Sequence, residues 1–65
     1  MKSEWRVTTN YTVGGKSFQV YRLMDLNDPD GEVEFAGPLY RNKDVAKREA
    51  DNLNKRDAER FWKHD

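Results

Sequence analysis

The chain has 65 residues, no cysteine, and 12 basic against 12 acidic residues, which gives a formal net charge of zero. A domain of this size lies near the lower limit for folding alone, and without cysteine it has neither a disulfide framework nor a thiolate metal site. The balanced charge argues against a non-specific nucleic-acid binder, and no apolar run forms a signal peptide or reaches the roughly 20 residues of a membrane span. We therefore expect one small cytoplasmic domain over residues 1–65, with no membrane partner.

Residues 4–13 alternate between apolar or β-branched side chains and polar ones, which is the period of a strand with one solvated face. Gly14 and Gly15 follow, and this pair suits a two-residue hairpin turn because glycine adopts positive φ angles without steric cost. Pairing Val13 with Lys16 across the turn brings the apolar residues of both strands to one face. The sequence therefore predicts a β-hairpin in that register.

The second strand, predicted over residues 17–26, is rich in β-branched and aromatic residues and carries apolar side chains on both faces. This composition is typical of a central strand with a neighbour at each edge. The acidic turn at residues 28–31 leads to a third strand over residues 32–40, and a four-residue loop pairs Leu26 with Val33. The residues that these registers place together on the core face are Trp5, Val7, Val20, Met24, Phe35 and Leu39.

Residues 43–62 contain no glycine or proline and many strong helix formers, so they predict a helix. Asn42 is a good N-cap, and Asp44 in the first turn complements the helix dipole. One narrow stripe of this helix is apolar and consists of Ala46, Ala50, Leu53 and Phe61. The predicted fold class is α+β: a three-stranded antiparallel β-meander in the order 1-2-3, with one C-terminal α-helix packed on one face.

The predicted registers place the charged Arg22 on the core face opposite Gly37, and Asp57 and Glu49 border the apolar stripe of the helix. A partly buried charge is rarely left without a partner. We expect Arg22 to pair with Asp57 or Glu49, or to extend its guanidinium to the sheet edge. The alternative is a recessed arginine that binds an anion.

Catalytic residue types are scarce. The only histidine, His64, stands next to the end of the chain, so a nucleophile–base pair or a histidine metal site lacks its residues. The acidic turn at residues 28–31 resembles part of a calcium loop, but Leu26 and Gly37 stand where the first ligand and the bidentate glutamate belong. We predict no enzyme activity, no cofactor and no metal site.

The sheet face opposite the helix is more apolar than a solvated face requires. Tyrosines beside aliphatic residues are typical of contact surfaces. We predict protein–protein contact or self-association through this face, and the alternative is the ordinary amphipathic surface of a very small protein. The candidate interaction residues are Arg6, Thr8, Tyr21, Leu23, Pro38 and Tyr40.

The sequence also resembles two groups of proteins. Three antiparallel strands followed by a helix that opens with Tyr40-Arg-Asn-Lys-Asp-Val-Ala-Lys-Arg-Glu-Ala50 resemble the arm-type (AP2-like) amino-terminal domains of phage and transposon integrases. That resemblance implies a sheet that enters the DNA major groove, so DNA binding is the alternative function. The strand at residues 20–25, the acidic turn and the Ala-x-x-Leu-Asn helix at residues 50–54 also resemble short uncharacterised bacterial and phage βββα proteins, which implies no known activity.

Overall fold

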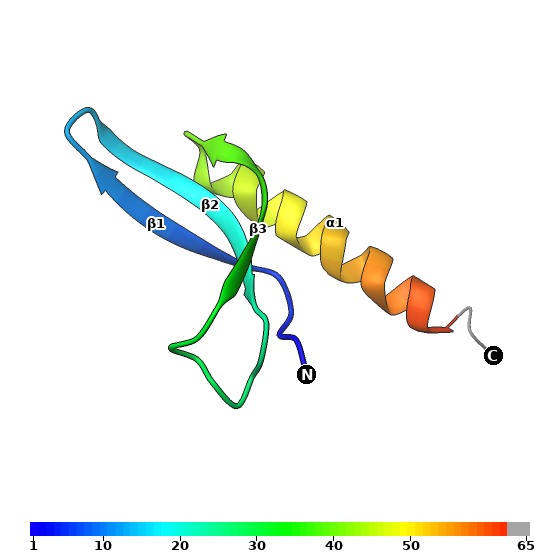
Figure 1. Cartoon of the computed structure of the whole chain (residues 1–65). Coiled ribbons are helices and arrows are strands. Elements are labelled where there is room, and N and C mark those ends of the chain that lie inside the picture. Colours follow the sequence, from blue (N-terminus) through cyan, green and yellow to red (C-terminus); the bar gives the residue numbers. More distant parts are fainter. Residues whose placement is uncertain (63–65) are drawn as a thin grey trace.

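The computed structural model describes residues 1–62, with side chains up to residue 58 (Figure 1). These residues form three strands and one helix: β1 (Arg6–Thr12), β2 (Gly15–Leu23), β3 (Val33–Tyr40) and α1 (Lys43–Trp62). The strands are antiparallel in the order β1-β2-β3, and α1 lies across one face of the sheet. The predicted α+β fold is confirmed. The helix has the predicted bounds. β1 starts two residues later and ends one residue sooner than expected, whereas β2 starts two residues sooner and ends three residues sooner.

The β1–β2 hairpin has a different register from the predicted one. Thr12 pairs with Gly15 around a Val13-Gly14 turn, and Val7 lies opposite Val20 rather than Arg22. Gly15 has a φ of 129°, a conformation that a side chain would strain. The shift amounts to two residues, so every side chain stays on its predicted face. Alternation alone cannot detect such a shift, because it has a period of two.

The β2–β3 register differs by an odd number of residues, and this turns β3 over. Arg22 pairs with Glu34 and Tyr21 with Phe35, whereas the prediction set Arg22 opposite Gly37. Phe35 is consequently 54% exposed on the face away from the helix. The expected four-residue loop is wrong because β2 ends at Leu23, which leaves nine residues between the strands.

β3 contains a bulge at residues 37–39. Val20 pairs with Ala36 and Phe18 with Tyr40, so three residues of β3 lie opposite the single residue between Phe18 and Val20. Gly37 has a φ of 75°, and a Cβ atom there would lie 2.8 Å from the Tyr40 hydroxyl. The bulge turns Tyr40 toward the core, so its predicted place on the face away from the helix is wrong.

The core lies between the sheet and α1 and is small. Its buried residues are Trp5, Val20, Ala46 and Ala50, with Val20 wholly inaccessible to solvent. The two alanines let the helix approach the sheet closely. The expected cap is present, because the Asp44 amide donates to Asn42 Oδ1 at 2.8 Å. The partly buried residues packed against the core are Val7, Phe18, Ala36, Tyr40 and Leu53, and the Phe61 side chain lies outside the described residues.

Candidate interaction surfaces

The face of the sheet opposite α1, called the open face here, has an apolar half near the β2–β3 connection. Tyr21 pairs with Phe35, and Leu23 pairs with Val33. Phe35 is 54% and Val33 38% exposed, Tyr21 is half-buried, and Leu23 is buried although it belongs to this face. Within the described residues the only helix packs on the other face. These four residues are called the apolar half of the open face below.

The other half of the open face is polar. Arg6 lies opposite Tyr21, and Thr8 lies opposite Gln19. Asn10 Nδ2 donates to Gln19 Oε1 at 3.1 Å, so two amide side chains form a bridge across β1 and β2. Of the six predicted interaction residues, Arg6, Thr8, Tyr21 and Leu23 lie on the open face by register. Pro38 is in the bulge, and Tyr40 faces the core.

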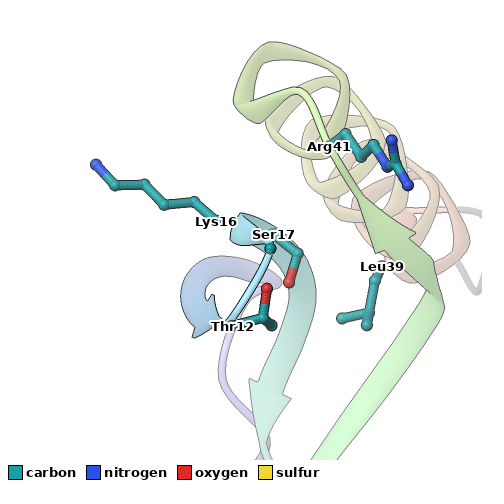
Figure 2. Close-up of a pocket in the computed structure, with 6 residues that line it drawn as sticks. Thr12, Lys16, Ser17, Leu39 and Arg41 are labelled. Carbon is teal, nitrogen blue, oxygen red and sulfur yellow. The ribbon is translucent and has the colours of Figure 1, made fainter.

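A hollow of about 480 Å³ lies at the hairpin end of the sheet. Figure 2 shows the hydroxyls of Thr12 and Ser17 close together on one side and Leu39 on the other, while Lys16 extends outward from the hairpin. Ser17 Oγ is buried without a hydrogen-bond partner among the described residues. The residues that line the hollow are Thr12, Gly14, Lys16, Ser17, Leu39 and Arg41.

Arg22 is the centre of a charged network on the core face. Its Nη2 atom lies 2.7 Å from Glu34 Oε1, and its Nη1 atom lies 3.5 Å from Asp57 Oδ2. The guanidinium also stacks 4.3 Å from the centroid of the Trp5 ring, whose Nε1 donates to Asp57 Oδ2 at 3.2 Å. The predicted Arg22–Asp57 pair is therefore present, with Glu34 in place of Glu49 as the other partner.

This network gives Arg22 a structural role. Its side chain is only 16% exposed, and both terminal nitrogens already contact carboxylates. Its Nε is buried without a partner among the described residues. Because the carboxylates occupy the ends of the guanidinium, the alternative of an anion-binding Arg22 has no support from this arrangement.

Two contacts at the start of β1 were missed by sequence reasoning. The Trp5 amide donates to Asn54 Oδ1 at 2.7 Å, and Asn54 Nδ2 donates to the Trp5 carbonyl at 3.1 Å. Asn54 therefore bonds both backbone groups of Trp5, as a neighbouring strand would. Ser3 similarly bonds β2, since its amide donates to the Leu23 carbonyl and its hydroxyl accepts from the Leu23 amide. The position of Asn54, four residues after Ala50 on the core-facing side, is the one sequence signal for the first contact.

The Arg6–Glu4 ion pair shifts the pKa values of both of its members. Arg6 Nε lies 3.0 Å from Glu4 Oε1. The hydrogen bond from Arg6 lowers the pKa of Glu4, and the same bond raises the pKa of Arg6. Both groups are solvated, so the pair orders the surface without burying charge.

A second hollow, of about 370 Å³, lies between β1 and the first half of α1. Trp5, Val7 and Ala50 provide its apolar part. Its charged lining residues are Arg6, Lys43, Lys47 and Asp51. In the part of the chain with described side chains, neither Lys43 nor Lys47 forms an ion pair.

No protein-family model, curated protein or solved structure matches this chain. Across residues 1–58, no three histidine, cysteine, aspartate or glutamate side chains gather closely enough to hold a metal ion. The one helix of the described residues is not apolar enough to cross a membrane. His64 lies outside the described residues, so the reading of that histidine stays a prediction. The absence of enzyme activity likewise stays a prediction.

Proposed function

We propose that this chain is a small non-enzymatic binding module that self-associates through the apolar half of its open face. The observation that carries the proposal is the exposure of Phe35, at 54%, beside Val33, at 38%, on a sheet face without a helix over it in the described residues. A contiguous patch of exposed apolar side chains on a small soluble domain is typical of a contact surface.

The area of the molecule supports a second copy as the occupant. The chain exposes 5331 Å², whereas a compact monomer of its mass exposes about 4,300 Å². The surplus of about 1,000 Å² is a value for the whole chain, and the open face of the sheet is part of that surface. A standard protein interface buries about 800 Å² on each partner, so one symmetric contact is of the same size as the surplus.

The chemistry of the patch also suits self-pairing. A two-fold dimer brings the same patch of each copy together, so the patch must tolerate itself. The apolar half consists of uncharged residues, and the nearby Arg6 is already paired with Glu4. Packing two such faces together therefore opposes no like charges. It also supplements a core of few residues, which in a domain of this size supplies only about 3–5 kcal/mol.

The test is sedimentation velocity over about a hundredfold range of concentration, because association is governed by mass action. We expect a concentration-dependent dimer for the natural chain and a monomer for Phe35→Ser. Val33→Thr and Val45→Thr form a matched pair, since the two valines are 38% and 42% exposed but Val45 lies on α1. The proposal predicts weakened association for Val33→Thr alone. A natural chain that stays monomeric throughout contradicts it.

DNA binding is the second candidate, and the hollow at the hairpin end favours it. Lys16 and Arg41 are the cations among the lining residues of that hollow, and Thr12 and Ser17 contribute hydroxyls to it. Amide and hydroxyl side chains on the polar half provide the groups that read base edges. A mobility shift with duplex DNA tests this function. Affinity that falls steeply with salt and weakens in a Lys16→Ala/Arg41→Ala variant supports DNA binding, whereas no shift at low salt removes it.

A further inference from the structure

The two edges of the sheet differ in how well they resist another strand. β3 has the bulge at residues 37–39, and Pro38 within it has no backbone N–H to donate. Bulges and prolines are the devices by which natural sheets prevent edge-to-edge pairing. β1 has neither, and all seven of its residues keep one regular register with β2. β1 is therefore the edge that can accept a strand.

The backbone of β1 presents a row of outward groups. Asn54 bonds both the amide and the carbonyl of Trp5, so the Trp5 backbone faces away from β2. Successive residues of an antiparallel strand alternate in direction, which turns the backbone groups of Val7, Thr9 and Tyr11 to the same side. None of these three makes a turn, loop or cap backbone bond within the described residues. Asn54 thus occupies the first position of this edge, and the next positions are open.

The hollow between β1 and α1 adds side-chain selectivity to this edge. Trp5, Val7 and Ala50 form an apolar site near Asn54, and Lys43 and Lys47 lie on the same hollow. Lysines four residues apart on a helix are separated by about 5–6 Å at their Cβ atoms. Alternate residues of a strand are separated by about 6.7 Å, so two acidic residues with one residue between them match the lysines. Asp51 is the one acidic residue of the hollow.

We propose that β1 binds an extended acidic segment of another protein, which adds to the sheet as a fourth strand. The backbone of the segment bonds the outward groups of Val7, Thr9 and Tyr11. Two of its acidic side chains pair with Lys43 and Lys47, and an apolar side chain on the same side enters the site at Trp5. Backbone bonds supply affinity in such strand addition, and side chains at alternate positions supply specificity. This site is separate from the open face, so it does not depend on the proposed self-association.

The probe is a capped eight-residue peptide with glutamate, glutamate and valine at alternate positions and threonine at the others. We expect saturable binding by calorimetry or fluorescence. Replacing the glutamates by lysines is expected to abolish it. In antiparallel addition the residues opposite Val7, Thr9 and Tyr11 share their side-chain face, so the backbone N–H groups that meet β1 are those of the valine and the glutamates. N-methylation of the valine and of the neighbouring glutamate removes two of these donors without changing charge, and strand addition predicts at least about a tenfold loss of affinity. Equal binding of the N-methylated peptide overturns the proposal.

Variants of the protein complete the test. Lys43→Glu/Lys47→Glu is expected to weaken binding at least about tenfold, because it reverses the charge of the site. Thr9→Pro removes an outward N–H, and edge strands tolerate proline there, so the variant is expected to keep its circular dichroism spectrum and lose the peptide. Lys55→Glu, a charge reversal farther along α1, is the control that keeps binding.

Two further outcomes separate this site from the open face. The Phe35→Ser variant is expected to bind the acidic peptide as well as the natural chain does, even when it no longer dimerises. If Thr9→Pro instead abolishes the dimer, the occupant of the β1 edge is a second copy of this chain. That result overturns the proposal of a foreign acidic segment. It also contradicts the assignment of the dimer contact to the open face.

Discussion

The two faces of the sheet distribute charge and aromatic surface in the opposite way from a simple amphipathic sheet. The face beneath α1 holds Arg22 and Glu34 beside the wholly buried Val20, whereas the open face leaves Phe35 54% exposed. The β2–β3 register causes this exchange, because pairing Arg22 with Glu34 directs Glu34 inward and Phe35 outward. A charge that needs a partner has more influence on register here than burial of one aromatic ring.

The largest effect is expected where the two faces differ most in burial. Val20→Ala removes two methyl groups from a side chain with no solvent exposure and should lower the free energy of unfolding by about 2–3 kcal/mol. Val33→Ala changes the same residue type on the open face, where 38% of it is exposed, and should cost less than about 1 kcal/mol. Urea unfolding at concentrations where the chain is monomeric checks both values. Equal losses would contradict the assignment of the faces.

The Arg22–Glu34 pair is expected to have the next largest effect. Glu34→Gln removes the carboxylate that lies 2.7 Å from an arginine side chain only 16% exposed, and should cost about 1–3 kcal/mol. The double variant Arg22→Met/Glu34→Met should recover most of this loss, since the one carboxylate that it leaves without Arg22, that of Asp57, is 50% exposed and therefore solvated. Urea unfolding of the natural chain, of Arg22→Met, of Glu34→Met and of the double variant measures the coupling between the two residues. Additive losses would show that the two side chains do not stabilise each other, which would contradict the influence assigned to this pair.

The glycine in the β3 bulge should contribute somewhat less to the free energy of unfolding than the Arg22–Glu34 pair does. Gly37→Ala places a side chain in the left-handed region and against the Tyr40 hydroxyl, 2.8 Å from the new Cβ, and should cost about 1–2 kcal/mol. Removing that hydroxyl in Gly37→Ala/Tyr40→Phe should restore part of the loss, because the nearest atom is then gone. Thermal unfolding of the single and double variants checks this. An unchanged melting temperature for Gly37→Ala would mean that β3 continues without the bulge.

The smallest expected effect concerns the solvated Arg6–Glu4 pair. The pKa of Glu4 lies below its ordinary value of 4.5, mainly because of the hydrogen bond from Arg6. A carboxyl whose pKa is lowered by folding stabilises the folded state above its unfolded pKa, and this contribution is lost as the pH falls through the lowered value. NMR titration of the Glu4 carboxyl should give a midpoint below 4.5 that rises toward it in Arg6→Met. A midpoint unaffected by that substitution would exclude the pair in solution.

Local signals in the sequence were sufficient for the elements and the topology. Asn42, Asp44 and the alanine-bearing stripe define the start and the packing side of α1, and both depend on residues within a few positions of one another. The alternation of β1 predicts its faces correctly for the same reason. Periodicity therefore predicts the three strands, their order and, for β1 and β2, the face that the helix covers.

The registers and half of the candidate surface required long-range information. Alternation cannot detect a two-residue shift in the hairpin, and the odd shift of β3 depends on Arg22 meeting Glu34 and on the bulge at Gly37. That shift is why Phe35 and Val33 replace Tyr40 on the open face. The bonds from Asn54 to Trp5 were not predictable either, since they depend on which backbone groups remain unpaired at the start of β1.

The central claim is that the apolar half of the open face contacts a second copy. An isotope-filtered NOE experiment on a mixture of labelled and unlabelled chains tests it most directly, because it records only contacts between molecules. We predict intermolecular NOEs between the Phe35 ring and protons of Tyr21, Val33 or Phe35 of another copy. Intermolecular NOEs confined to β1, or none in a sample that sediments as a dimer, would contradict the account.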